Sequence, residues 1–471
     1  MIKFPFSSVD WYVKRDNRTN AVEGIGGFEK FSLGIMVDPA VKLQPKIQAM
    51  ALICLNLCSR WCRNIILDMP SECPDLLFKR GKTFNSCLRE TASDADPHIQ
   101  ILTGNIDEKK IDGLLVIGNL ATIPTESYTW INCDGWLAGV GLGPTNYGLS
   151  VDGSKNILGA AMAACLGVAA LFRRANGIVE TQPYSVWHSL YDFKANRTPE
   201  GLHNPSIKED IDFGNIFQIG CGAVGSSLDY LLSLTEWSGR LHLIDYDRVD
   251  YPDCNRSLMF SAYDAVNQKY KTEVCYERLQ DKFETFRHEF SYSDFIERLG
   301  EKTSIPDLIL CLANEQNVWP TIQHNFPPVV LHATTTRNWG INFGRHLPLK
   351  EWCILCRFAE EFSKQHNFTP PCSESIINDS RFTQEPKQIL GVLPFLSAAS
   401  AAMIAAEIAK LNMEESLSRN NFGQFSFRNP AENFIAIHQS KKEDCLCNTQ
   451  QLEIYERFRE NGKYWKKEAI K

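Results

Sequence analysis

The chain has 471 residues, more than one ordinary hydrophobic core requires, and its length suggests two or three domains. Its contents of 44% hydrophobic and 22% charged residues are ordinary for a folded soluble protein. The net charge of −7 and the isoelectric point near 5.9 argue against a nucleic-acid-binding protein, although a local basic patch is compatible with them.

The first residues contain no long apolar stretch, so no signal peptide is predicted. Two runs of small and apolar residues, 157–172 and 393–411, have the composition of possible membrane spans. The first is short and rich in Gly and Ala, and the second contains Pro394 and Glu407. Both are better interpreted as buried helices, and we expect a cytoplasmic protein without a membrane partner.

The 16 cysteines are expected to be reduced thiols, metal ligands or a nucleophile, because the cytosol disfavours disulfides. Most lie in apolar helical patterns and are interpreted as small buried hydrophobic residues. These include Cys54, Cys58, Cys62 and Cys165.

Residues 1–205 are predicted to form one unit. The pattern of residues 47–69 is typical of a helix that packs on at least two sides, residues 112–120 resemble a buried strand, and residues 156–174 a second helix. A polar segment with Pro and Gly, residues 194–215, is the expected linker.

After the linker, strand-length apolar runs alternate with helical segments. This alternation predicts βαβ units and a mainly parallel sheet covered by helices, which is the α/β fold class. The expected strands lie at residues 216–220, 239–245, 306–313 and 327–334.

A glycine motif follows the first of these strands. Gly220, Gly222 and Gly225 form G-x-G-x-x-G where the strand turns into a helix. The glycines permit close backbone approach, and the helix N-terminus favours phosphate. Dehydrogenases share this motif and use one acidic residue about 20 positions further on to bind the ribose.

The residues beyond the motif favour ATP as a consumed substrate. An acidic pair, Asp245 and Asp247, is followed by Asn255 and Arg256, and Lys269 stands 13 residues after the arginine. A dehydrogenase has no evident use for this Arg and Lys. An enzyme that splits ATP between its α- and β-phosphates needs such cations to screen the charge that develops as a carboxylate attacks.

This constellation resembles the superfamily of E1 ubiquitin-activating enzymes and the bacterial MoeB, ThiF and HesA adenylyltransferases. Their pattern is a Gly-rich turn, then D-x-D, then N-x-x-R and a lysine 13 residues later; here Asp253 replaces the first asparagine. The resemblance implies that Asp245 holds the ATP ribose and that Arg256 and Lys269 act in catalysis by contacting the triphosphate. The implied ATP-binding set is Gly220, Gly222, Gly225, Asp245, Asp247, Asn255, Arg256, Lys269 and Asn314.

The implied magnesium site departs from the family pattern. Where the family usually has an aspartate after the fourth strand, this chain has Asn314, with Glu315 beside it. Asn supplies a neutral oxygen, which is a weaker Mg²⁺ ligand than a carboxylate, and Glu315 is the residue that can compensate.

Two close cysteine pairs indicate a metal site. Cys353 and Cys356 form CxxC, and Cys445 and Cys447 form CxC. Four thiolates of this kind can bind one tetrahedral Zn²⁺, and the resembled family often carries a structural zinc in these places. Buried thiols or a redox-active CxxC are the alternatives.

The resemblance also implies a nucleophile. In the family, the CxxC is followed by a Pro-rich crossover loop with a reactive cysteine, here about residues 357–390. Cys372, between Pro371 and Ser373, holds that position in a polar segment. Its thiolate would attack an acyl-adenylate and form a thioester, and an ordinary loop cysteine is the alternative.

Residues 1–205 contain no second Gly-rich fingerprint with its acidic pair and cations. Their strand, loop and Gly/Ala-rich helix resemble the inactive adenylation-like half of some E1-like proteins, so residues 1–205 are expected to be this inactive domain and residues 206–471 the active one. Such a half replaces the second subunit of a MoeB-type dimer and can donate an arginine to the ATP site. Arg15 and Arg18 are the candidates, and both a monomer and a homodimer fit this arrangement.

Taken together, the motifs look most like E1 proteins of bacterial ubiquitin-like conjugation operons, some of them antiphage systems. This implies adenylation of the C-terminal glycine of a ubiquitin-like β-grasp protein, a thioester on Cys372, and transfer to an E2-like protein. A MoeB/ThiF-type sulfur-carrier activator would use the same adenylation site. A non-catalytic scaffold that binds a ubiquitin-like partner is the alternative of another class, and a dehydrogenase ranks last.

Overall fold

The structure is a computed structural model of the chain. It describes residues 4–22, 24–78, 81–144, 156–178, 180, 182–299, 306–313, 318–325, 327–336, 338–347, 350–356, 391–429, 434–443, 445, 447 and 462–464.

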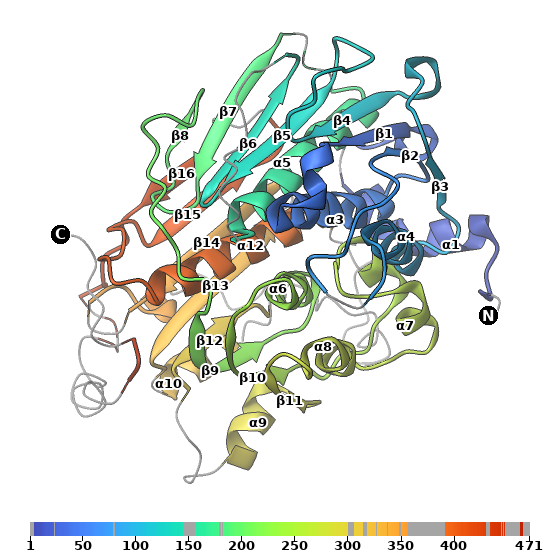
Figure 1. The fold of residues 1–471 in the computed structure, drawn as a ribbon. Coiled ribbons are helices and arrows are strands. Elements are labelled where there is room, and N and C mark those ends of the chain that lie inside the picture. The colour runs from blue at the N-terminus through green and yellow to red at the C-terminus, as the bar shows by residue number, and fades with distance from the viewer. Residues whose placement is uncertain are drawn as a thin grey trace.

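Two eight-stranded sheets with the same strand order dominate the fold (Figure 1). The first has the order β3-β2-β1-β4-β5-β6-β7-β8 and the second β11-β10-β9-β12-β13-β14-β15-β16. In both, the first five strands of this order are parallel and the last three pair antiparallel. The predicted α/β class, a Rossmann-like domain preceded by a related one, is confirmed.

The first sheet and its helices use residues up to 196. The strands are β1 (Ser32–Val37), β2 (Asn64–Asp68), β3 (Gln100–Thr103), β4 (Gly113–Ile117), β5 (Thr129–Asp134), β6 (Leu137–Leu142), β7 (Tyr184–Ser189) and β8 (Ala195–Asn196). The helices are α1 (Ser8–Arg15), α2 (Asn17–Asn20), α3 (Pro45–Ser59), α4 (Phe84–Ala95) and α5 (Leu158–Ala175).

The second sheet begins at residue 212. Its strands are β9 (Asp212–Ile219), β10 (Ser238–Ile244), β11 (Glu284–His288), β12 (Leu308–Cys311), β13 (Val329–Thr336), β14 (Gly340–His346), β15 (Phe422–Ser426) and β16 (Phe434–Ile437). The helices are α6 (Ala223–Ser233), α7 (Ala262–Val266), α8 (Lys271–Leu279), α9 (Tyr292–Leu299), α10 (Val318–His324) and α12 (Pro394–Leu411).

Two predicted elements are wrong in part: the linker over 194–215 contains β8 and the start of β9, and one predicted helix is too long. The helix expected over residues 47–69 ends at Ser59, and residues Asn64–Asp68 form the parallel strand β2. Apolar residues run through both segments, and periodicity alone cannot separate a buried helix from a buried strand. The β-branched pair Ile65 and Ile66 favours the strand that replaces the end of the expected helix.

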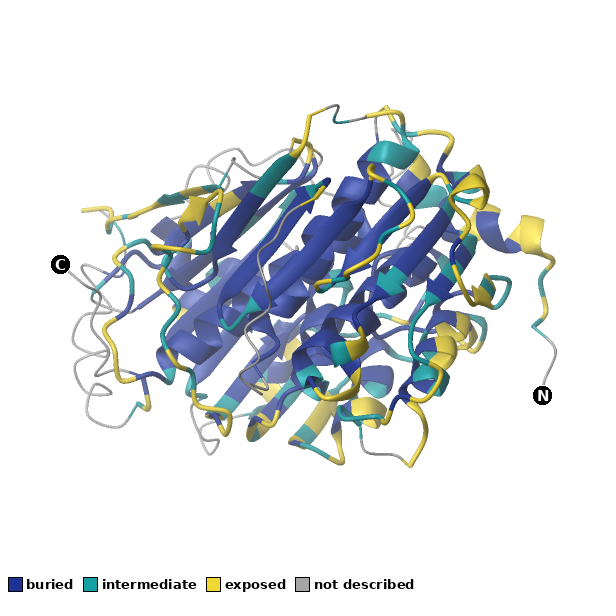
Figure 2. Cartoon of the chain, turned by 45° about the horizontal axis from the view of Figure 1, so that its top comes forward, coloured by how far each residue is buried: buried dark blue, intermediate teal, exposed yellow. Residues whose placement is uncertain are grey.

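Four helices fill the space between the sheets and form one continuous core. α3 packs on α5, α6 packs on α12, and α5 and α12 pack on each other. Both α5 and α12 are long and apolar enough to cross a membrane, but they are buried in the interior, as Figure 2 shows by its dark blue central helices. This agrees with their interpretation as core helices.

Small residues allow these helices to approach the sheets closely. A Cβ atom at Gly159 of α5 would collide with the carbonyl oxygen of Leu137 at the start of β6. Gly167, two turns further along α5, lies in the same way against Ile131 of β5. The Gly and Ala content that resembled a membrane span therefore serves close packing of helix on sheet.

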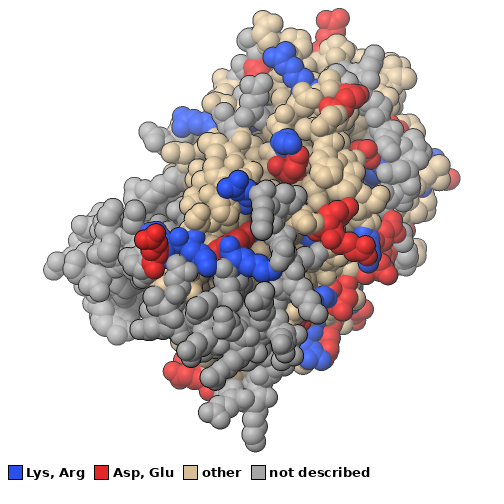
Figure 3. All heavy atoms as spheres, turned by 90° about the vertical axis from the view of Figure 1, so that its left-hand side faces the viewer, with Lys and Arg blue, Asp and Glu red and all other residues tan. Residues whose placement is uncertain are grey.

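The surface seen in Figure 3 carries mixed charge. On this face, Lys and Arg side chains of the described residues lie among Asp and Glu side chains and do not gather into one extended basic area. A partner that meets this part of the surface therefore finds both signs of charge.

The aromatic contacts of Phe172 give a test of this core. Phe172 of α5 is fully buried, and its ring lies 5.5 Å from that of Trp339 and 5.7 Å from that of Phe395 in the second half, centroid to centroid. Phe172→Ala should lower the free energy of unfolding by about 3–5 kcal/mol, because it leaves a cavity between the halves. Urea denaturation followed by tryptophan fluorescence and circular dichroism measures this change.

Ile435→Ala on the edge strand β16 is the control, since Ile435 is 55% exposed. It should change the free energy of unfolding by less than about 1 kcal/mol. An equal loss in both variants would contradict the central role given to the packing around Phe172.

Candidate active site and metal-binding cluster

The glycine motif forms a phosphate-binding type of turn between β9 and α6. Gly220 has a φ of 98°, a conformation that L-residues rarely adopt, and Gly222 is the N-cap of α6. A Cβ atom at Gly225 would collide with the carbonyl oxygen of Gly220. The N-cap Gly222 has no side chain that could accept a hydrogen bond from the first turn of α6. The first N–H groups of the helix are therefore available to an anion.

Asp245 lies at the carboxyl end of β10 and braces this turn. Its two carboxylate oxygens accept hydrogen bonds from the backbone N–H groups of Cys221, at 2.7 Å, and Asp247, at 2.8 Å. Burial raises the pKa of Asp245 to about 6, with Lys271 opposing this rise and Asp247 adding to it. Lys271 and the two backbone N–H groups favour the ionised form, whose oxygens keep lone pairs for a ribose hydroxyl.

Lys271, which the spacing argument did not select, is the lysine beside the acidic pair. It is the first residue of α8, and its buried Nζ lies 2.9 Å from Asp247 Oδ2 and 3.8 Å from Asp253 Oδ2. Lys269 has a different environment. Its Nζ lies 2.7 Å from Glu277 and 3.8 Å from Asp264.

Backbone pairing explains this placement. The N–H of Lys271 donates to the carbonyl of Asp247, and the N–H of Val249 donates to the carbonyl of Lys269. This short antiparallel contact brings the start of α8 back to the end of β10. The helical pattern that begins at Lys271, rather than the count from Arg256, was the sequence signal that could have identified this lysine.

Asn255 and Arg256 are buried beside the same cluster. Arg256 Nη2 donates to Asp253 Oδ1 at 2.5 Å, and Nη1 donates to the carbonyl of Pro252. Asn255 Nδ2 donates at 2.6 Å to Thr19 Oγ1, which belongs to α2 in the first half of the chain. The two halves therefore meet directly at the candidate site.

Cations surround Asp253, which replaces the family's asparagine. Burial acts to raise its pKa, but Lys271, Arg256, a hydrogen bond from the N–H of Asp250, and Arg18 together hold this pKa below its ordinary value. Arg18 comes from α2, so one of the two arginines considered for donation by the first half contributes positive charge at this point.

Arg15 has a different role. Its buried guanidinium forms ion pairs with Asp16, at 2.7 Å, and Asp96, at 2.8 Å, and it donates to the carbonyl of Ser59. All of these partners lie in the first half, so Arg15 stabilises the interior of that half.

At the related place after β1, the described residues of the first half form no equivalent phosphate turn. After β1, which holds the place in its sheet that β9 holds in the other, comes Asp38. Its carboxylate accepts hydrogen bonds from the N–H groups of Ala40, at 2.7 Å, and Asn119, at 2.8 Å. The Asp38 carboxylate therefore accepts the hydrogen bonds of these two N–H groups at this edge of the sheet, and its negative charge would repel a phosphate there.

Three predicted site residues, Asn314, Glu315 and Cys372, lie outside the described residues. The roles assigned to them stay predictions.

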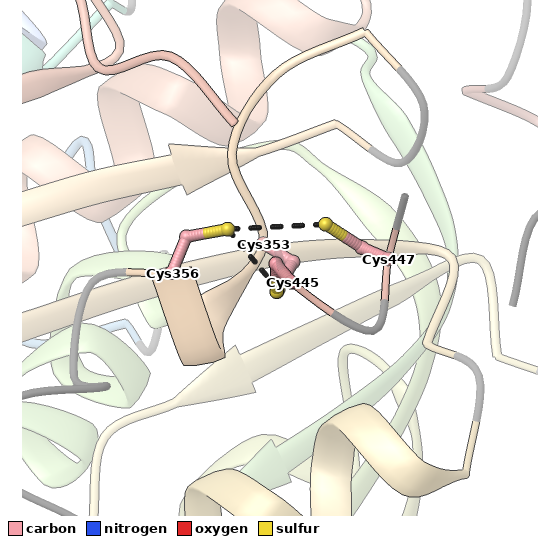
Figure 4. A group of neighbouring side chains, drawn as sticks. All are labelled: Cys353, Cys356, Cys445 and Cys447. Carbon is pink, nitrogen blue, oxygen red and sulfur yellow. Dashed lines mark hydrogen bonds between the residues drawn. The ribbon is translucent and has the colours of Figure 1, made fainter. Parts of the chain in front are cut away.

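The four cysteines of the two pairs converge on one point (Figure 4). The Sγ–Sγ distances are 3.7 Å for Cys353–Cys356, 3.4 Å for Cys353–Cys445 and 3.8 Å for Cys356–Cys447. Tetrahedral Zn²⁺ with bonds of about 2.3 Å requires sulfur atoms about 3.8 Å apart. Hydrogen bonds among the four thiols lower the pKa of Cys356 and Cys445 and raise that of Cys353 and Cys447. The cluster fits a structural Zn²⁺.

Comparison with known families assigns the chain. The model of the ThiF family matches residues 201–448, and the model of the BilD N-terminal domain matches residues 32–190. The chain belongs to the ThiF family. It therefore has the E1-like adenylating fold, which supports an ATP-dependent enzyme.

Solved structures show distant similarity. A crystal structure of E. coli MccB is 14% identical and covers 69% of this chain and 95% of its own, with a TM-score of 0.34. The structure of E. coli MccB with ATP is 15% identical and covers 69% of this chain and 98% of its own, with a TM-score of 0.35. A structure of PaaA is 15% identical and covers 49% and 72%, with a TM-score of 0.32. No curated protein sequence matches the chain.

The cysteine cluster predicts bound metal. The purified protein should contain about one zinc per chain, and Cys445→Ser should lose most of it, because three thiolates hold Zn²⁺ less tightly than four. Elemental analysis by mass spectrometry after dialysis gives the zinc content.

Cys73→Ser, which changes a buried cysteine outside the cluster, is the matched control and should keep its zinc. Wild-type protein without zinc would favour the alternative of four buried thiols.

Proposed function

We propose that the protein is an E1-like enzyme that adenylates the C-terminal glycine of a ubiquitin-like protein. The observation that carries this proposal is the convergence of the glycine turn, Asp245 and the buried cations Arg256 and Lys271 at the carboxyl edge of the second sheet. In open α/β sheets, ligands bind at this edge.

In the proposed reaction, the turn and the N-terminus of α6 bind the phosphates of ATP, and the carboxylate of Asp245 accepts a hydrogen bond from a ribose hydroxyl. Arg256 and Lys271 screen the charge that builds on the α-phosphate as the glycine carboxylate attacks it. A bond forms between the carboxylate oxygen and the α-phosphorus, the bond to the β-phosphate oxygen breaks, and pyrophosphate leaves. Asn314 and Glu315 are the proposed ligands of the Mg²⁺ that accompanies ATP.

The first half of the chain is proposed to complete this site. Thr19 binds Asn255, and Arg18 acts electrostatically on Asp253. Arg18 is therefore the proposed donated arginine. The carboxylate of Asp38 at the related edge of the first sheet supports a single ATP site per chain, in the second half.

Cys372 is the proposed thioester nucleophile. Its thiolate would attack the acyl-adenylate carbonyl, and AMP would leave. The other 15 cysteines support this choice, because 14 are buried and Cys445 belongs to the metal cluster. Burial raises the pKa of the thiols of Cys254 and Cys311, the other nucleophiles that could be considered, and this disfavours their thiolates.

Two alternatives share parts of this site. A sulfur-carrier activator would use the same adenylation residues and would make no thioester with Cys372. A non-catalytic scaffold would need no cations at the phosphates, so the buried Arg256 and Lys271 speak against it. The proposed partners of the enzyme are a ubiquitin-like β-grasp protein and an E2-like protein.

The two lysines give a direct test of the ATP site. With a ubiquitin-like protein from the neighbouring genes, Lys271→Ala should reduce ATP–pyrophosphate exchange by at least about 100-fold, because it removes a fixed cation from the transition state. Lys269→Ala should stay within a few-fold of the wild type, since Lys269 pairs with Glu277. Circular dichroism checks that both variants are folded.

The opposite result, a large loss in Lys269→Ala alone, would restore the assignment made from the spacing to Arg256. Wild-type rates of ATP–pyrophosphate exchange in both variants would show that neither Lys269 nor Lys271 contributes to adenylation.

A second test separates adenylation from thioester formation. Cys372→Ala should keep pyrophosphate exchange and lose the adduct with the ubiquitin-like protein that dithiothreitol cleaves on a non-reducing gel. Cys254→Ala is the control and should keep both. Exchange without an adduct in the wild type would indicate a sulfur-carrier activator, and no exchange would indicate a scaffold.

A further inference from the structure

A buried arginine of the first half contacts the segment that carries Asn255 and Arg256. Arg60 is the C-cap of α3 and is 2% exposed. Its partners outside its own helix are backbone carbonyls of residues 254–260, which lie in the second half. We call residues 254–260 the site segment.

The guanidinium of Arg60 spans the site segment. Nη1 donates to the carbonyls of Cys254, at 2.6 Å, and Phe260, at 3.2 Å, and Nη2 donates to that of Leu258, at 2.9 Å. Asn56, one turn earlier on α3, accepts from Arg60 Nε at 2.9 Å and itself donates to Leu258 at 3.0 Å. One planar side chain therefore fixes three carbonyls over seven residues.

Burying the Arg60 guanidinium lowers the stability of the folded chain, so a role other than stability explains its position better. Arg60 forms no ion pair among the described residues, Asp94 acts on it only at longer range, and burial lowers its pKa to about 10. A buried charge without a carboxylate is unfavourable unless its hydrogen bonds are used fully. Here they are used on the loop that carries the proposed phosphate-binding arginine.

We propose that Arg60 is a positioning residue, which holds the site segment so that Asn255 and Arg256 face ATP. This inference rests on the proposed function. If Arg60 has this role, the first half of the chain affects the affinity for ATP in two ways: through Arg60 at the end of α3 and through the contact of Thr19 with Asn255.

Arg173 of α5 provides a matched control. It is also a buried arginine of the first half that donates to a backbone carbonyl of the second half, that of Phe427, at 2.8 Å. It also pairs with Glu180 and interacts with Tyr184, and it contacts no residue of the site segment in the described hydrogen bonds. Arg173→Lys therefore removes a comparable contact between the halves without touching the site segment.

The experiment compares ATP binding by the full chain. Isothermal titration with Mg²⁺-ATP gives the Kd, and amide hydrogen exchange reports on residues 254–260. Arg60→Lys should raise the Kd about tenfold or more and speed exchange in the site segment, because one ammonium cannot replace the planar fork. Arg173→Lys should leave both quantities near the wild-type values.

If Arg60→Lys does not fold, Asn56→Ala serves in its place and should change both quantities in the same direction, by a smaller factor. Equal Kd values and equal exchange in the Arg60 and Arg173 variants would overturn the role of Arg60. A wild-type chain that does not bind ATP would instead overturn the proposed function and the ATP role of Arg60 with it, while the exchange comparison would still show whether Arg60 holds the segment.

Discussion

The close packing of α5 on α12 is the contact on which the rest of the structure depends. Each helix lies on its own sheet, α5 with small Gly and Ala residues and α12 with Ala and Ser, and each also packs against the helix of the other half. Once the two helices are in contact, α3 and α6 close the same core from either side. The first elements of the chain then reach the loop after β10, and the two halves share one core and one candidate site.

The shared strand order makes the differences between the halves informative. The carboxyl edge of the second sheet has Gly220, which lets the backbone approach a phosphate, whereas Asp38 accepts the N–H groups at the related edge of the first sheet. The first half nevertheless contacts the candidate site of the second through Thr19 and Arg60, and Arg18 adds positive charge there. Under the proposed function, the doubled fold separates the role of binding phosphate from the role of holding the binding loop.

Sequence reasoning predicted the placement of residues that are local in sequence. The glycine turn, Asp245 and the cysteine pairs lie close in sequence or follow fixed element ends, and the structure brings the four cysteines together as predicted. It did not identify contacts that depend on residues distant in sequence. Lys271 reaches Asp247 through backbone pairing after a segment that includes α7, and Arg60 of α3 contacts Cys254, 194 residues further along the chain. No spacing within one segment encodes either contact.

The charges of the site constrain how ATP can bind as proposed. Arg256 is held by Asp253, and Lys271 lies between Asp247 and Asp253. These carboxylates keep buried cations in fixed positions and offset the cost of burying them. A triphosphate must share these cations with the aspartates or take them over, and the repulsion between phosphates and aspartates must be screened by Mg²⁺ or by Arg18. The aspartates therefore favour a nucleotide that arrives with its metal over a bare polyanion.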